Sequence, residues 1–105
     1  LLDKELLFQI AENLTANALR FARETVMVTL CVTGGQLTLT VADDGGGFPL
    51  SLLKDGVQPF HKGAEEAGHF GMGLYICDLL CRKHGGSLTL RNDHGAVACA
   101  SLKIS

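Results

Sequence analysis

The sequence VADDGGGF at residues 41–48 ends an alternating segment in two acids and three glycines. The residues that lead into it, 36–42 (QLTLTVA), alternate apolar and polar side chains, which predicts a half-buried strand. Glycine lets the chain turn sharply and lets a ligand approach the backbone closely. A carboxylate at such a strand end can accept a hydrogen bond from the exocyclic amine of a base. We therefore take Asp43 as a candidate base-binding acid, with an ordinary acidic turn as the alternative interpretation.

Regular segments are expected upstream of this stretch. Residues 26–33 (VMVTLCVT) are apolar and β-branched, and Gly34–Gly35 predicts a tight turn that joins them to residues 36–42 in a β-hairpin. Before the hairpin, apolar residues recur at spacings of three and four, which predicts a helix over residues 3–23 with Asp3 as its N-cap.

A second helix and a second hairpin are expected downstream. Residues 50–54 predict a short helical turn, and residues 72–84 a helix with its apolar side chains on one face and Asp78 on the opposite, polar face. Residues 87–92 and 96–104 predict the closing hairpin. This order of elements predicts an α+β fold, a two-layer α/β sandwich with helices packed on one face of a mainly antiparallel mixed sheet.

Length and composition limit the class of protein. The 105 residues, 47% hydrophobic and 19% charged, make one globular domain over residues 1–105. The net charge of −2 and the lack of a basic stripe argue against nucleic acid as a partner. No apolar run reaches the ~18 residues of a membrane span, so no direct membrane contact is expected. The four cysteines match neither a zinc nor a disulfide framework, which indicates a reducing compartment.

Asn13 and Asn17 are a pair of amides on the first predicted helix. Because they are four residues apart, they lie on one helix face beside the buried stripe. An amide oxygen is a hard, neutral ligand that suits Mg²⁺, which takes its other ligands from water and substrate phosphates. A solvated pair of polar residues is the alternative interpretation.

The segment GMGL at residues 71–74 runs into the second predicted helix. A glycine-rich loop at a helix N-terminus offers free N–H groups and the positive end of the helix dipole to phosphates. It is not a Walker loop, because no Gly-Lys-Ser/Thr follows, and not a dinucleotide fingerprint, because no strand leads directly into it. Taken alone, this loop is a weak indication of a phosphate site.

The order and spacing of these motifs resemble the GHKL ATP-binding fold, also called the Bergerat fold. Within it, the chain is similar to the ATP-binding catalytic domain of sensor histidine kinases. Asn13–Asn17 matches the N box of that family, residues 43–47 (DDGGG) its G1 box, residues 59–63 (PFHKG) its F box and residues 71–74 its G2 box. The resemblance covers nearly the whole chain and implies ATP and Mg²⁺ as cofactors.

The resemblance also implies roles for single residues. Asn17 would ligate Mg²⁺ between the ATP phosphates, and Asn13 would assist it. Asp43 would accept from the adenine N6 amine, which selects ATP over GTP because guanine presents an oxygen there. Residues 61–70 would form a lid over the phosphates, anchored by Phe60. Further nucleotide contacts are expected from Arg20, Phe21, Gly45, Gly47, Phe48, Lys62, Gly71, Met72, Gly73 and Leu74.

Some of these residues have simpler interpretations. Phe21 also fits the core stripe of its helix, and Lys62 could be solvated. Cys77, Cys81 and His84 share one helix face at a spacing that suggests a metal site, but that face is apolar, where free cysteine packs as a small hydrophobe.

The resemblance implies a protein-histidine kinase. ATPases and serine kinases of the same superfamily typically carry Glu four residues before the magnesium Asn, where it acts as a base, but here that position is Asn13. A histidine acceptor needs no strong base, because its imidazole has a free lone pair near pH 7. Glu12 is one residue away and is expected to face solvent. A GHKL-type ATPase or serine-kinase module, and a nucleotide-binding regulatory module without transfer activity, remain the alternatives.

The resemblance further implies partners outside this chain. The phosphoacceptor histidine would lie on a helical dimerisation domain upstream, reached in cis or in trans, and the phosphoryl group would then pass to a response regulator. The chain would be a fragment of a longer protein and would lie in the cytoplasm, as the cytoplasmic portion of a membrane-anchored sensor.

Overall fold

The structure is a computed structural model and describes residues 3–57 and 70–104, with residues 70–72 described by their backbone alone. Its elements are α1 (Lys4–Phe21), β1 (Val26–Thr33), β2 (Gln36–Asp43), α2 (Leu50–Asp55), α3 (Phe70–Lys83), β3 (Ser87–Asn92) and β4 (Ala96–Lys103). Each element that the sequence predicts is present, with bounds that differ from the expected ones by two residues at most.

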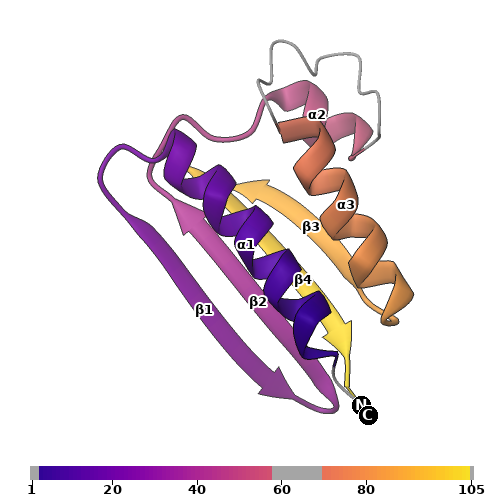
Figure 1. Cartoon of the computed structure of the whole chain (residues 1–105). Coiled ribbons are helices and arrows are strands. Elements are labelled where there is room, and N and C mark those ends of the chain that lie inside the picture. Colours follow the sequence, from indigo (N-terminus) through magenta and orange to yellow (C-terminus); the bar gives the residue numbers. More distant parts are fainter. Residues whose placement is uncertain (1–2, 58–69, 105) are drawn as a thin grey trace.

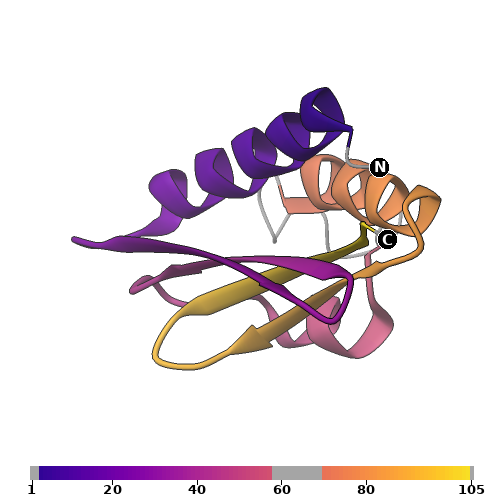
Figure 2. The same cartoon turned by 90° about the horizontal axis from the view of Figure 1, so that it is seen from below.

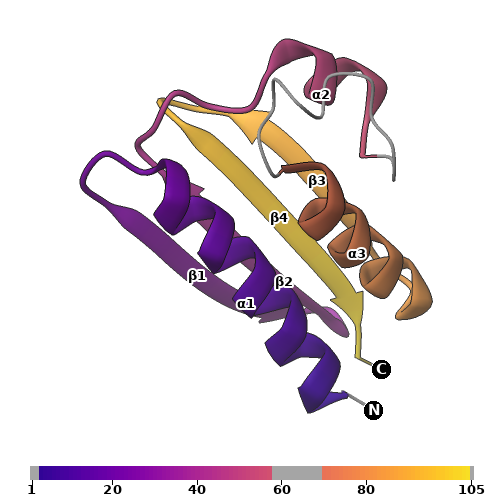
Figure 3. The same cartoon turned by 45° about the horizontal axis from the view of Figure 1, so that its top comes forward.

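The four strands form one sheet in the order β1-β2-β4-β3, and every pair among these strands is antiparallel. Helices α1 and α3 lie side by side on one face of the sheet (Figures 1 and 2). The short helix α2 lies near the start of α3 (Figure 3). The predicted two-layer α+β arrangement is therefore confirmed, but the described sheet is wholly antiparallel and not mixed as expected.

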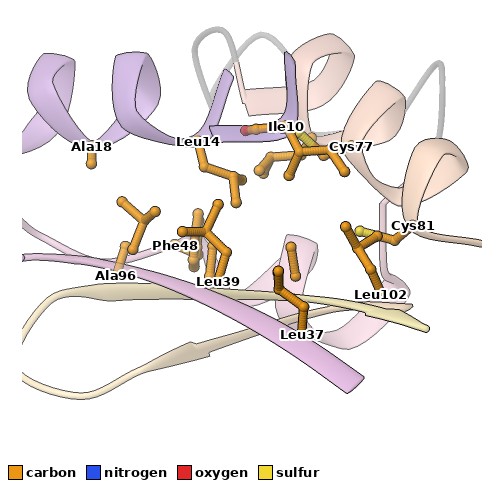
Figure 4. Close-up of a cluster of buried hydrophobic side chains, with 14 of the residues drawn as sticks. Ile10, Leu14, Ala18, Leu37, Leu39, Phe48, Cys77, Cys81, Ala96 and Leu102 are labelled. Atoms are coloured by element: carbon orange, nitrogen blue, oxygen red, sulfur yellow. Dashed lines mark hydrogen bonds between the residues drawn. The ribbon is translucent and has the colours of Figure 1, made fainter. Parts of the chain in front are cut away.

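Helix α1 is held by its cap and by its buried stripe. Asp3 caps the helix, because its Oδ1 accepts a hydrogen bond from the Leu6 N–H at 3.2 Å. Ile10, Leu14 and Ala18, each four residues after the last, are buried in the core between helices and sheet (Figure 4). Neither α1 nor any other helix within residues 3–57 and 70–104 is long and apolar enough to cross a membrane.

Helix α3 buries Leu74, Cys77 and Cys81 as expected, but the prediction for Asp78 is wrong. Asp78 is only 7% exposed, and its carboxylate forms an ion pair with Arg82 at 3.1 Å. It lines a hollow of about 280 Å³ together with side chains of α2 and β3. The helical periodicity places Asp78 away from the main core, but it contains no information about the elements that cover that flank.

Strand β1 lies at an edge of the sheet and pairs with β2 alone among the described strands. Leu30 and Val32 pair with Leu39 and Leu37, and therefore point to the face that carries the helices. Leu37 and Leu39 are buried there, whereas Leu30 and Val32 are 56% and 59% exposed. The helix layer thus covers β2 and leaves the apolar side chains of β1 largely open.

Candidate functional site

The turn after β2 holds a carboxylate in a fixed direction. Asp43 ends β2, and its Oδ1 accepts a hydrogen bond from the Gly45 N–H at 2.7 Å. The same turn brings Gly45 against the end of α1, where a β-carbon would overlap the carbonyl oxygen of Phe21. Only glycine permits this approach. One oxygen of the half-buried Asp43 carboxylate is therefore committed to the turn, which orients the other oxygen.

Asp44 braces this turn against the segment between α1 and β1. Its carboxylate accepts hydrogen bonds from the backbone N–H groups of Arg23 at 2.8 Å and Glu24 at 3.0 Å. These hydrogen bonds, the one from Glu24 foremost, lower the pKa of Asp44 to about 2. Sequence reasoning missed this brace, because it joins residues about twenty positions apart.

Asn92 supports the other end of the same loop. At the end of β3, its Oδ1 accepts from the Phe48 N–H at 2.8 Å and its Nδ2 donates to the Phe48 carbonyl oxygen at 3.0 Å. Gly47 has a positive φ of 86°, and a β-carbon there would lie 2.9 Å from the Asn92 side chain. Phe48 itself is buried, at 6% exposed. The sequence carries no local signal for Asn92, which lies 44 residues from Phe48.

Asn17 offers an amide without a partner. Its Nδ2 is buried and has no hydrogen-bond partner within residues 3–57 and 70–104. Gly73 of α3 lies opposite, where a β-carbon would come within 3.9 Å of that nitrogen. Asn13, one turn earlier on α1, is half-buried and does not line the cavity that Asn17 lines. Of the two amides that the sequence pairs, Asn17 is therefore the one that lies beside the glycine of α3.

Asn17 and Asp43 line one small cavity. It measures about 10 Å³, which is at the limit for a single water molecule. The lining residues are Leu14, Asn17, Ala18, Val41, Asp43, Phe48, Leu74, Ala96 and Ala98.

Other predicted site residues lie further away or outside the described residues. Arg20 is exposed in the last turn of α1, and Phe21 is half-buried against the core, which agrees with its core interpretation. Gly71 and Met72 lie in the first turn of α3, which begins at Phe70 and not at residue 72 as expected. Lys62 and the F box at residues 59–63 lie outside the described residues, as does the expected lid over residues 61–70 except for the backbone of Phe70.

Glu12 lies on the outer side of α1. It is exposed, as expected, and lines an open hollow of about 560 Å³ with Lys4, Glu5, Phe8 and Gln9. This hollow is larger than the cavity at Asn17 and Asp43, but it is a shallow surface along one helix and includes neither residue. The carboxylate of Glu12 therefore does not face the cavity.

The described residues thus form a two-layer α+β domain in which Asn17 and Asp43 line one cavity and Gly73 of α3 lies beside Asn17. Residues 2–105 match the family model described as "Histidine kinase-, DNA gyrase B-, and HSP90-like ATPase". The chain belongs to this family.

Relatives within the family are sensor kinases. The alginate biosynthesis sensor protein KinB of Pseudomonas aeruginosa is 30% identical over 96 residues, which are 90% of this chain and 16% of KinB. The chain thus spans about a sixth of the length of this relative. The catalytic domain of histidine kinase ThkA superposes with a TM-score of 0.79 at 24% identity, over 97% of this chain and 67% of that one. Full-length ShkA in complex with AMPPNP superposes with a TM-score of 0.75 at 24% identity, over 98% of this chain and 23% of ShkA.

Proposed function

We propose that this chain is the ATP-binding catalytic domain of a two-component sensor histidine kinase. The observation that carries the proposal is that Asn17 of α1 lines one cavity with Asp43 of β2 and lies beside Gly73 of α3. These residues come from three of the four sequence motifs and are far apart in the chain. The family match and the sensor-kinase relatives support the proposal, as does the AMPPNP that ShkA binds.

Asp43 is the residue that recognises adenine in this proposal. Its Oδ1 is held by the Gly45 N–H, so its second oxygen is the one that accepts from the N6 amine of the base. Guanine presents an oxygen at the same position, and two acceptors repel each other. The carboxylate therefore selects ATP over GTP by hydrogen-bond polarity.

Asn17 is the residue that faces the phosphates and Mg²⁺. Its buried amide has no partner among the described residues, so a ligand there removes the cost of an unsatisfied polar group. The amide oxygen and nitrogen are interchangeable by a flip of the side chain, and the oxygen is a ligand type that Mg²⁺ accepts. The residue therefore fits the metal, which when bound would neutralise phosphate charge. Gly73 leaves room over the amide for this group.

Phosphoryl transfer to histidine fits helix α1, because neither of its glutamates, Glu5 and Glu12, lines the cavity at Asn17. Asn13 takes no proton at neutral pH, and Glu12 is exposed on the outer side of α1. The chain's own contribution is then positioning and charge compensation. The acceptor is a histidine on an upstream helical dimerisation domain, in cis or in trans, and a response regulator receives the group next. In this proposal, the domain works in the cytoplasm.

Calorimetric titration of the chain with AMPPNP and Mg²⁺ tests the proposal. We expect saturable one-to-one binding, and Glu12→Gln should bind as the wild type does. With radiolabelled ATP, acid-labile label should be found on the dimerisation domain of the same full-length protein and not on this chain. No binding at millimolar analogue would contradict the nucleotide site, and acceptor-independent hydrolysis that Glu12→Gln abolishes would favour an ATPase.

A further inference from the structure

We infer that Asn92 is a positioning residue for adenine recognition, which acts through the loop over residues 43–48 without touching the base. This inference rests on the proposed function. The side-chain amide of Asn92 forms two hydrogen bonds with the backbone of Phe48. It accepts from the Phe48 N–H at 2.8 Å and donates to the Phe48 carbonyl oxygen at 3.0 Å.

Only a side-chain amide supplies this pair of bonds. An amide carries one acceptor and one donor about as far apart as the N–H and carbonyl of a single residue. A carboxylate at position 92 would set an oxygen against the Phe48 carbonyl, and alanine would remove both hydrogen bonds from Asn92 to the backbone of a buried residue. Gly47 is closely packed against the same amide, so a shift of the Asn92 side chain would shift the loop over residues 43–48 as well.

The turn that follows Asn92 supports the other end of the loop as well. A β-carbon at Gly95 would overlap the Asp43 carbonyl oxygen, and Gly95 itself is buried. The β3–β4 turn therefore contacts the loop at Asp43 and at Phe48. Asp43 is coupled to this support through its hydrogen bond with Gly45, in the middle of the loop. Release of Phe48 is thus expected to loosen the direction of the Asp43 carboxylate.

Two variants of Asn92 test the inference by nucleotide binding. Asn92→Ala and Asn92→Asp should each weaken ATP-analogue binding about tenfold, the change in affinity that one hydrogen bond corresponds to. They should also reduce the preference for the adenine over the guanine analogue, which a loss of global stability alone would not change. In the Asp43→Asn background, Asn92→Ala should cause less than half of the loss of ATP-analogue affinity that it causes in the wild type. Both substitutions act on the hydrogen bond between Asp43 and the base, so their effects on affinity do not add.

Gln36→Ala is the matched control. It removes a side-chain hydrogen bond, from Gln36 Nε2 to Ser101 Oγ at 3.1 Å, at the other end of the same sheet. It should leave both affinity and base preference unchanged. Equal losses in Gln36→Ala and Asn92→Ala, or an unchanged base preference in Asn92→Ala, would overturn the inference.

Amide hydrogen exchange without nucleotide tests, independently of ATP, whether Asn92 holds the loop over residues 43–48 in place. Asn92→Ala should raise the exchange rate at Gly45, three residues from the lost contact, as well as at Phe48. A Gly45 rate that stays at the wild-type value would overturn the inference even where Phe48 exchanges faster. If the wild-type chain binds no analogue, the proposed function fails, and the Gly45 rate still establishes or refutes the positioning role.

Discussion

Replacing Asp43 by asparagine should reverse the hydrogen-bond polarity of the base site and leave the fold intact. The Gly45 N–H needs an acceptor at 2.7 Å, so the new side chain keeps its amide oxygen there and turns its NH₂ group toward the base. That donor then faces the donating N6 amine of adenine. The lost hydrogen bond to a charged group is worth about 1.5–3 kcal/mol, which corresponds to a roughly 10- to 100-fold weaker affinity for ATP.

The assay is paired calorimetry with adenine and guanine triphosphate analogues. Asp43→Asn should bind the adenine analogue more weakly and narrow or invert the preference, because the amide donates to the guanine oxygen. Asp3→Asn is the control: it makes the same change of charge at the far end of α1, where asparagine caps a helix as well as aspartate. An Asp43→Asn variant with wild-type affinity and preference would refute the reasoning, and so would an equal loss in Asp3→Asn.

Three further outcomes follow from the packing and the titrating groups. Gly45→Ala should lower the free energy of unfolding in urea by about 1–3 kcal/mol, the usual cost of overpacking. Gly46→Ala should change it little, because its β-carbon meets open space; equal losses would contradict the close contact at Gly45. The pKa of Asp44 is lowered from 3.8 to about 2, so its stabilising effect is present above pH 3.8 and is lost as the pH falls toward 2. The thermal midpoints of wild type and Asp44→Asn should therefore converge as the pH falls from 3.8 toward 2. A difference between the two midpoints that stays constant over this range would argue against the lowered pKa of Asp44. Burial raises the pKa of the Cys77 thiol from 9.0 to about 12, so its stabilising effect holds below pH 9.0 and is lost as the pH rises above it. At about pH 8, iodoacetamide should modify the exposed Cys31 first and Cys77 only on unfolding, as mass spectrometry would show.

Local periodicity predicted the secondary structure well, because each element has its own pattern. The alternation of residues 36–42 and the apolar stripe of residues 3–23 are properties of single segments, and both elements are present. The motifs at Asn17 and Asp43 were found in the same way, through residue types at fixed offsets, and these two side chains do line one cavity.

Long-range contacts account for what the sequence did not reveal. The bridge from Asn92 to Phe48 depends on how β3, β4 and β2 are aligned in the sheet, which no single segment encodes. Asn13 fits the same helical spacing as Asn17, yet it does not line the cavity that Asn17 shares with Asp43. Asp78 was misjudged for the same reason, since its surroundings come from α2 and β3.

Strand β1 has a consequence for the behaviour of the isolated chain in concentrated solution. The strand VMVTLCVT carries no charged residue and no proline, the two features that usually prevent edge strands from joining other sheets. Among the described strands it pairs with β2 alone, and its Leu30 and Val32 side chains are more than half exposed. Net charge then supplies little colloidal protection, because the whole chain carries only −2. The solubility of the isolated chain is therefore expected to depend on whether another segment or protein covers the β1 edge of the sheet.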